Sequence, residues 1–269
     1  MKQSMSRVAS NEELLPGVYL MWIDDPDIAS MAGAGQFVTL RCEGLILRRP
    51  FAVHQANPGQ VAILFRAVGE GTRWLSRRRR GDWVDVLGPL GNGFSIGPDS
   101  GNLLLLAGGI GIAPLVLLAQ RASAQHGVTL IHGAATGIEV YPIASVRGNG
   151  EELRPLADRV RFIEVTEDGS RGLKGLVSGV ATDFLDWADQ VYACGPVDMY
   201  KAISQLATGC GAAVGDKIGK CQVSLEVRMG CGIGACRGCT VITERGAKRV
   251  CSDGPIFEMS DILWSEVRL

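Results

Sequence analysis

Four cysteines near the end of the 269-residue chain have a spacing that suits metal chemistry. Cys236 follows Cys231 after four residues, Cys239 follows after two more, and Cys251 follows after a further eleven. Three close thiolates and a fourth that returns later are the ligand pattern of plant-type [2Fe–2S] clusters. Glycines between the cysteines allow the backbone to wrap tightly and to aim N–H groups at the sulfurs. The spacing therefore predicts a [2Fe–2S] cluster held by these four residues.

The cysteines also allow other interpretations. A structural zinc site uses four thiolates too, although its ligands more often come as two C-x2-C pairs. A zinc-stabilised adaptor without catalytic activity is therefore an alternative. Cys42, Cys210 and Cys221 do not fit the spacing, and we expect them to be reduced, buried and unliganded.

A glycine-rich turn in the middle of the chain predicts a phosphate site. The string AGGIGIAPL (Ala107–Leu115) follows an apolar strand and opens a helix, so Gly109 and Gly111 would let the backbone approach a pyrophosphate. The string departs from the G-x-G-x-x-G pattern because Pro114 occupies the third position. A plain strand-to-helix turn is the alternative interpretation.

A second turn strengthens the dinucleotide prediction. The string YACGPVDM (Tyr192–Met199) also ends a predicted strand and enters a helix, and it contains Cys194, Gly195 and Pro196. Cys194 alone would be an ordinary buried cysteine at a strand end. Ligands of open α/β sheets bind outside the carboxyl ends of the strands. Both turns can therefore border one crevice, which predicts a nicotinamide dinucleotide site.

The elements that must position these residues change along the chain. The first part has short β-forming runs separated by turns and no convincing helical period, which predicts an antiparallel barrel or sandwich. These runs are Val18–Ile23, Gln36–Cys42, Gln60–Val68 and Asp82–Leu87. From Asn102, strands alternate with helices, which predicts a parallel, doubly wound sheet. Its strands are expected at Asn102–Gly109, Val128–Gly133, Val160–Val165 and Asp189–Gly195, and its helices at Pro114–Ala124, Val177–Leu185 and Val197–Leu206.

These patterns predict three domains. Residues 1–100 form the β-barrel, residues 101–215 form the doubly wound α/β domain, and residues 216–269 form a small cluster domain. A nicotinamide exchanges two electrons as hydride, whereas an iron–sulfur cluster carries one. A chain that holds both needs a converter, and flavin has that chemistry.

Charge and hydropathy exclude other classes. The net charge of -1 gives no attraction for a nucleic acid. No apolar run reaches the roughly 18–20 residues that span a bilayer, and the start of the chain lacks the apolar segment of a signal peptide. We therefore expect no membrane association and a cytoplasmic location. The basic run Arg77–Arg80 is expected to be a solvated loop rather than a contact for an acidic partner.

Several strings, in this order, resemble the ferredoxin reductase-like flavoproteins, and among them the electron transfer subunits of dihydroorotate dehydrogenase B. The resemblance covers about Gly17 to Phe257. It is carried by RRPFAV, GEGT, GDWVDVLGPLGNGF, GGIGIAP, TEDGSRGLKG, ACGPVDM and SLEVRMGCGIGACRGC with its trailing VCSDGPIF. The cysteine segment with that trailing string is the most diagnostic part. The resemblance implies an FAD-binding barrel, an NAD-binding domain and a C-terminal [2Fe–2S] domain.

The resemblance also implies roles for single residues. Arg49 would pair with the FAD pyrophosphate, and Phe51 would flank the flavin. Relatives usually carry Ser or Thr where this chain has Ala52, so a hydroxyl contact with flavin N5 is in doubt. The implied FAD residues are Arg49, Pro50, Phe51, Ala52, Gly71 and Thr72. The implied dinucleotide residues are Gly109, Gly111 and Pro114, with Cys194, Gly195 and Pro196 where the nicotinamide meets the flavin.

The function implied is electron transfer in pyrimidine biosynthesis. A partner FMN-containing dihydroorotate dehydrogenase would pass electrons through the cluster and FAD to NAD⁺, in a heterotetramer of two catalytic and two electron-transfer subunits. NAD is favoured over NADP mainly by the family, because the strand over Val128–Gly133 ends without an acidic residue and without a basic cluster. The alternative is a reductase subunit of a hydrogenase or of a ferredoxin-dependent bifurcating complex.

Overall fold

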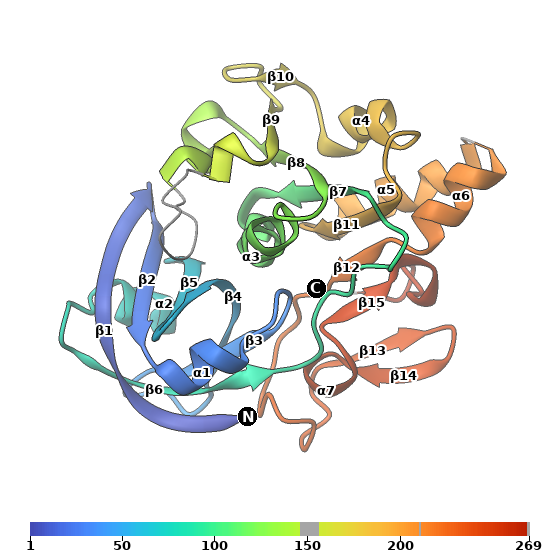
Figure 1. Cartoon of the computed structure of the whole chain (residues 1–269). Coiled ribbons are helices and arrows are strands. Elements are labelled where there is room, and N and C mark those ends of the chain that lie inside the picture. Colours follow the sequence, from blue (N-terminus) through green and yellow to red (C-terminus); the bar gives the residue numbers. More distant parts are fainter. Residues whose placement is uncertain (146–155, 210, 268–269) are drawn as a thin grey trace.

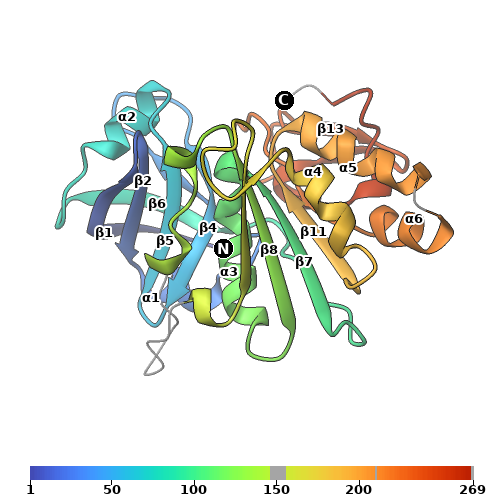
Figure 2. The same cartoon turned by 90° about the horizontal axis from the view of Figure 1, so that it is seen from above.

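The computed structural model describes residues 1–145, 156–209 and 211–267. Cys210, which was expected to be buried and unliganded, lies outside these residues. Figures 1 and 2 show a barrel formed by the first part of the chain, an α/β unit beside it, and a carboxyl-terminal segment that lies along both.

Six antiparallel strands close into a barrel in the order β1–β2–β5–β4–β3–β6. Their bounds are β1 Lys2–Leu15, β2 Val18–Asp24, β3 Phe37–Arg41, β4 Arg49–Asn57, β5 Gln60–Arg66 and β6 Trp83–Leu90. The closed barrel confirms the first of the two predicted architectures. Closure pairs every strand on both sides, so no open edge remains.

Strands β1 and β4 were not in the predicted set. In β1 only Ser6 and Val8 are fully buried, so the strand shows no apolar alternation. In β4 the buried residues include His54 and Gln55, and Pro50 is unusual inside a strand. Both strands exist because their neighbours pair with them, which is a tertiary effect that a local pattern does not contain.

Two short helices interrupt the barrel where no helical period was found. They are α1, Pro26–Met31, and α2, Glu70–Ser76. Each is shorter than two full turns, so an apolar repeat cannot develop. In α1 the Asp25 carboxylate caps the helix by accepting the N–H of Ile28 at 3.0 Å.

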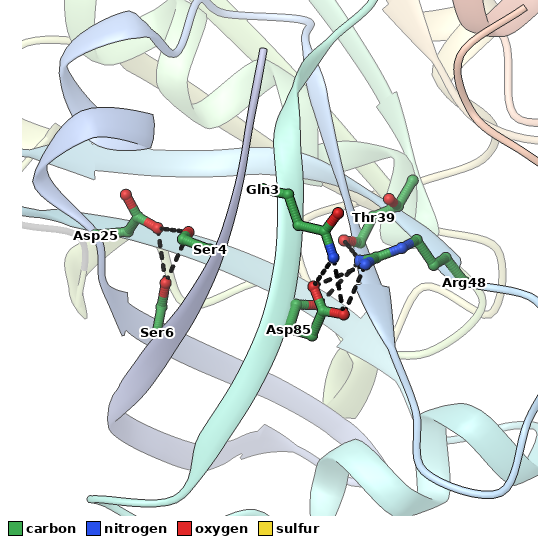
Figure 3. Close-up of polar contacts among 7 residues, drawn as sticks. All are labelled: Gln3, Ser4, Ser6, Asp25, Thr39, Arg48 and Asp85. Atoms are coloured by element: carbon green, nitrogen blue, oxygen red, sulfur yellow. Dashed lines mark hydrogen bonds and ion pairs between the residues drawn. The ribbon is translucent and has the colours of Figure 1, made fainter.

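Polar side chains fasten β1 to the rest of the barrel (Figure 3). Arg48 donates two hydrogen bonds of 2.7 Å to the Asp85 carboxylate, and Gln3 donates to the same carboxylate at 3.1 Å. Asp25 accepts the Ser6 hydroxyl at 2.6 Å. The charge of Arg48 is therefore paired with Asp85 and is not available to a ligand.

The α/β unit is a seven-stranded sheet in the order β10–β9–β8–β7–β11–β12–β15. Its strands are β7 Asn102–Gly108, β8 Gly127–Ala134, β9 Arg161–Thr166, β10 Leu173–Lys174, β11 Gln190–Cys194, β12 Gln222–Ser224 and β15 Ile256–Glu258. All neighbours are parallel except β12 and β15. The predicted parallel sheet is therefore confirmed.

Helices cover both faces of this sheet. Leu103 and Leu105 of β7 belong to the core shared with α3 and the barrel, whereas Leu104 and Leu106 belong to the core shared with α4 and α5. Figure 2 shows α3 between sheet and barrel. The helices are α3 Ile112–Ala122, α4 Val177–Ala181, α5 Val197–Gly209 and α6 Ala212–Gly219, and the 3-10 turns are η1 Gly109–Gly111, η2 Gly137–Glu139, η3 Ile143–Ser145, η4 Leu156–Asp158 and η5 Thr182–Phe184.

The carboxyl-terminal segment contributes to the α/β sheet as well as carrying the cysteines. Its elements are β12, β13 Thr240–Thr243, β14 Gly246–Arg249, α7 Val250–Asp253, β15 and η6 Met259–Asp261. Strands β12 and β15 extend the sheet next to β11, and the predicted border between 215 and 216 falls inside α6. This segment therefore shares a core with the α/β unit.

Among the helices of the described residues, none combines the length and the apolar character that crossing a membrane requires.

Candidate functional site

The loop that carries the clustered cysteines turns backbone donors toward sulfur. The N–H of Gly234 donates to Cys251 Sγ at 3.0 Å, and the N–H of Cys236 donates to Cys231 Sγ at 3.4 Å. Cys236 Sγ accepts another such bond, and Cys239 Sγ accepts the N–H of Cys251, both at 3.4 Å. Each of the four sulfurs thus accepts at least one backbone hydrogen bond. Such bonds stabilise thiolates that ligate an iron–sulfur cluster.

The larger interactions among the four sulfurs are those of Cys231 with Cys236 and of Cys251 with Cys239, and Cys251 interacts less strongly with Cys231. Burial by itself would raise the pKa of Cys231, but the backbone N–H groups outweigh it and lower that pKa. Burial and the nearby Cys239 sulfur raise the pKa of Cys251. A diiron unit takes two thiolates at each iron, which suits this pairing.

The backbone of the cysteine loop takes an unusual conformation at one residue. Arg237, inside the cysteine loop, has a φ of 57°, and it is the only described non-glycine residue with a positive φ. That conformation costs roughly 1–2 kcal/mol in an L-residue, so the loop is held in it by its surroundings. We take the arrangement to fit a [2Fe–2S] cluster.

The cysteine loop rests directly on the barrel. A Cβ at Gly232 would lie 3.1 Å from Thr39 Cγ2 of β3 and 3.6 Å from Leu90 Cδ1 of β6. Asn92, just after β6, accepts the N–H of Ile256 at 2.9 Å and donates to its carbonyl at 2.9 Å. The segment that follows Cys251 is thereby fastened to the barrel exit, and the cluster loop has a fixed position relative to β3.

Arg49 and Gly71, both predicted FAD residues, lie together. A Cβ at Gly71 in α2 would be 3.0 Å from Arg49 Nε, so the guanidinium lies close over the first turn of that helix. Arg49 Nη1 donates to Leu47 O at 2.7 Å, and among the described residues no carboxylate pairs with it. Thr72 Oγ1 accepts the N–H of Gly69 at 2.9 Å, so this hydroxyl shapes the turn.

The other predicted FAD residues continue along β4. Pro50, Phe51 and Ala52 are half-buried, and the Phe51 ring packs against Phe65 with centroids 5.6 Å apart. Ala52 pairs with Phe37 of β3 and has no hydroxyl, so it cannot supply the flavin N5 contact. This strip of β4 therefore offers an apolar surface next to the Arg49 charge.

The two glycine turns meet at the ends of β7 and β11. A Cβ at Gly111 would lie 2.2 Å from Cys194 O, and one at Gly108 would lie 2.7 Å from Pro196 Cδ. Only glycine permits such close approach. Gly109 has a φ of 53° and no atom within 4 Å of the position that its Cβ would occupy. The outer side of this turn is therefore open to a ligand.

Pro114 is placed differently from the two glycines. It is buried in the first turn of α3, and its missing N–H costs no helical hydrogen bond there. The structure thus puts Pro114 behind the opening rather than on its surface.

Residues that the sequence analysis did not single out complete the end of β11. Tyr200 Oη donates to Ser224 O at 2.6 Å and accepts the N–H of Gly195 at 3.0 Å, which pins the turn after Cys194. Burial, helped by the Glu226 carboxylate, raises the pKa of Cys194 to about 12, so this thiol stays protonated. The residue Glu226 as a whole is exposed, but the atoms around its carboxyl shield that group from water, which raises its pKa. Ser224 and Glu226 lie in the SLEVRMGC string quoted above, but only the fold shows that they meet Tyr200 and Cys194.

Two protein-family models match the chain. The iron–sulfur cluster binding domain of dihydroorotate dehydrogenase B matches residues 226–263, which contain all four clustered cysteines. The oxidoreductase NAD-binding domain matches residues 105–205, which contain both glycine turns. The two matches agree with the two sites that the geometry distinguishes.

Solved structures share all or most of this architecture. A structure of the NADH-dependent reduced ferredoxin-NADP oxidoreductase, described in connection with flavin-based electron bifurcation, has a TM-score of 0.82 and 29% identity over 98% of this chain and 91% of that chain. A ferredoxin NADP⁺ reductase from Neisseria gonorrhoeae with bound FAD and NADP has a TM-score of 0.63 and 19% identity over 78% and 92%. The second likeness shows the fold alone.

Curated relatives match over nearly their full length. The electron transfer subunit of dihydroorotate dehydrogenase B (NAD(+)) from Desulforamulus reducens is 40% identical over 93% of this chain and 94% of its own length. The subunit of the same name from Caldanaerobacter subterraneus subsp. tengcongensis is 36% identical over 96% and 98%. The chain belongs to the family of dihydroorotate dehydrogenase B electron transfer subunits.

Proposed function

We propose that this protein carries electrons from a dihydroorotate-oxidising partner to NAD⁺ in pyrimidine biosynthesis. One observation carries the proposal: three sites adjoin in one chain. The cysteine loop rests on β3 and β6, β3 pairs with the β4 strand that starts at Arg49, and β4 packs on α3, which begins at the Gly109–Gly111 turn. Bound FAD supplies the exchange between electron pairs at a nicotinamide and single electrons at a cluster.

The side chains of this protein bind and place the reacting groups. Arg49 offers an unpaired planar cation to a pyrophosphate, and Phe51 offers an apolar flank to the flavin. Gly109 leaves the turn open to the phosphates of NAD, and Gly111 lets the turn pack closely against Cys194. The thiol of Cys194 is protonated at the turn where the nicotinamide would arrive, so it adds no charge there. Proton transfer by a side chain is not required.

The partner in this proposal is an FMN-containing dihydroorotate dehydrogenase subunit, assembled with this chain as a heterotetramer. The relatives are named electron transfer subunits, and a subunit implies a second chain. Cys236 is exposed and Ile233 beside it is 49% exposed, so the cluster loop presents a face through which electrons can enter. The seven cysteines within the described residues are all free thiols, which favours the cytoplasm.

Reconstitution tests the proposal. The chain is expressed with the FMN-containing dihydroorotate dehydrogenase of its own organism, and NADH formation from dihydroorotate is measured anaerobically. We expect NADH only when both chains are present, and we expect the two chains to elute together. NADH formation by the partner alone, or a pair of folded, cofactor-loaded chains that neither associate nor form NADH, would overturn the proposal.

A second candidate is supported by the 29% identical solved structure, whose description names electron bifurcation with reduced ferredoxin and NADP. In that case the chain would serve a ferredoxin-dependent partner. Purification of the native complex distinguishes the two, because the flavin and the cluster would look alike while the accompanying subunit would differ.

A further inference from the structure

A buried histidine holds the carbonyl of the dinucleotide turn. His132, near the end of β8, is 1% exposed, and its Nε2 lies 3.1 Å from Gly109 O. A carbonyl can only accept, so Nε2 carries the proton. The other ring nitrogen, Nδ1, accepts the N–H of Tyr141 at 3.3 Å. The two bonds fix both the tautomer and the orientation of the ring.

A second buried histidine braces the same turn from the barrel side. His54 of β4 is fully buried, and its Nδ1 donates to Ala113 O of α3 at 2.9 Å. Its Nε2 accepts the hydroxyl of Tyr141 at 2.8 Å. Tyr141 therefore links the two rings, with its backbone N–H on His132 and its hydroxyl on His54. The start of α3 is held from the sheet and from the barrel by one continuous hydrogen-bonded chain.

Both rings stay neutral in the folded protein. Burial lowers the pKa of His54 to about 4, and it lowers the pKa of His132 to about 4 even though Glu164 acts in the opposite direction. A neutral imidazole has one donor and one acceptor, and each ring uses both. The brace is therefore a neutral structure with every ring nitrogen satisfied.

Gly109 O accepts hydrogen bonds from His132 Nε2 and from the N–H of Ile112, and these two bonds set the direction of the next backbone donor. A trans peptide is planar, with its C=O and N–H on opposite sides. When Gly109 O points toward His132, the N–H of Ile110 points to the opposite side of the peptide. Ile110 lies in the first turn before α3, where N–H groups have no intrahelical acceptor. That donor is then available to a diphosphate.

We propose that His132 is a positioning residue for the dinucleotide: through its bond to Gly109 O it holds the turn in the orientation that binds the pyrophosphate. His54 and Tyr141 support it from the barrel. The inference rests on the proposed function, because it takes the open turn as the NAD site. If the His132 ring only filled space in the core, its contribution to stability would not depend on whether Nε2 donates to Gly109 O.

Substitution of His132 by glutamine or by asparagine distinguishes a positioning role from a role in packing alone. A glutamine amide nitrogen reaches about as far along the side chain as Nε2, whereas an asparagine amide reaches only as far as Nδ1. H132Q can therefore keep the bond to Gly109 O, and H132N cannot. At His54 the donor is Nδ1, so the ranking reverses: H54N keeps the bond to Ala113 O and H54Q loses it.

Affinity for ADP-ribose, which has the pyrophosphate but no redox group, is measured by calorimetry on the full chain with its cofactors. We expect H132N to raise the Kd about tenfold, as it would if the binding orientation fell to about a tenth of the molecules. We expect H132Q to stay within about threefold of wild type. At saturating NADH the rate of flavin reduction should be unchanged in both, because only binding is affected.

The control is H126L. His126 also bonds a backbone carbonyl, Ser100 O at 2.8 Å, but it lies just before β8, at the amino ends of the strands. We expect no change in Kd there. Equal Kd values for H132N and H132Q would overturn the inference. If H132N fails to fold, the His54 pair carries the test, and a Kd for H54N equal to or above that of H54Q would overturn the inference. A wild-type chain that binds no ADP-ribose would instead overturn the proposed function.

Discussion

The proposed cluster site takes its four ligands from one segment, 231–251, whereas the proposed dinucleotide site takes its parts from the ends of β7, β8 and β11, which are far apart in sequence. In the loop the stabilising bonds run from backbone N–H groups to sulfurs of the same segment. At the proposed dinucleotide site they run between elements, as from Tyr200 to Ser224 and from His132 to Gly109. A substitution in the cysteine loop is therefore expected to affect the cluster alone. A substitution that breaks a contact between elements is expected to impair both dinucleotide binding and stability.

The largest expected effect breaks the local site alone. C236S should abolish normal cluster assembly, because one iron would lose a thiolate, while flavin stays bound at the barrel. Iron, acid-labile sulfide and flavin content are measured together. The matched control is C221A, which removes a buried thiol outside the cluster. Loss of flavin in step with the iron would contradict the separation of the two sites.

The next effect breaks the assembled site at its tightest contact. G111A places a methyl group 2.2 Å from Cys194 O, so β7 and β11 must move apart. NADH-dependent dye reduction should fall by more than about tenfold and the melting temperature should drop, because backbone cannot yield as a side chain does. G179A is the control, since nothing lies within 4 Å of its Cβ position. Near-normal dye reduction in G111A would mean that the two turns do not need this contact.

The third prediction compares two arginines of the barrel region, Arg49 and Arg77. R49A should weaken FAD binding about tenfold to hundredfold, the range for losing a hydrogen bond from a charged group. R77A, at the exposed end of α2, should leave FAD affinity unchanged. Flavin fluorescence during dilution gives both dissociation constants. Equal affinities for R49A and R77A would show that Arg49 does not meet the cofactor.

The last effect concerns the pH dependence of stability and not activity or binding. His54 and His132 have pKa values lowered to about 4 by burial, against 6.5 for a free histidine, so the unfolded chain binds more protons below that value. Their stabilising contribution is complete above about pH 6.5 and is lost as the pH falls toward 4, by up to about 3 kcal/mol for each ring. Melting curves from pH 7 to pH 4 of wild type and H132Q measure it. If the melting temperature falls with pH equally steeply in both proteins, His132 is not the group that titrates.

Features contained in a short stretch of sequence could be predicted, whereas features that depend on contacts between distant segments could not. The cysteine spacing and the apolar run Asn102–Gly109 are contained in short windows, so the cluster loop and β7 could be predicted. Strand β1 and the Tyr141 link could not, because their positions are set by partners distant in sequence. Arg48 and Arg49 are another example, because they are identical neighbours in the sequence. Only the fold shows that the Arg48 guanidinium is paired with the Asp85 carboxylate.

One anaerobic measurement tests the central claim, that a single chain connects NAD to a cluster through a flavin. The isolated, fully loaded protein is titrated with NADH while visible absorption follows the flavin and electron paramagnetic resonance follows the cluster. The account predicts that NADH reduces both centres in wild type and only the flavin in C236S. Reduction of the cluster by NADH in protein stripped of flavin, or no reduction of either centre in the loaded protein, would contradict it.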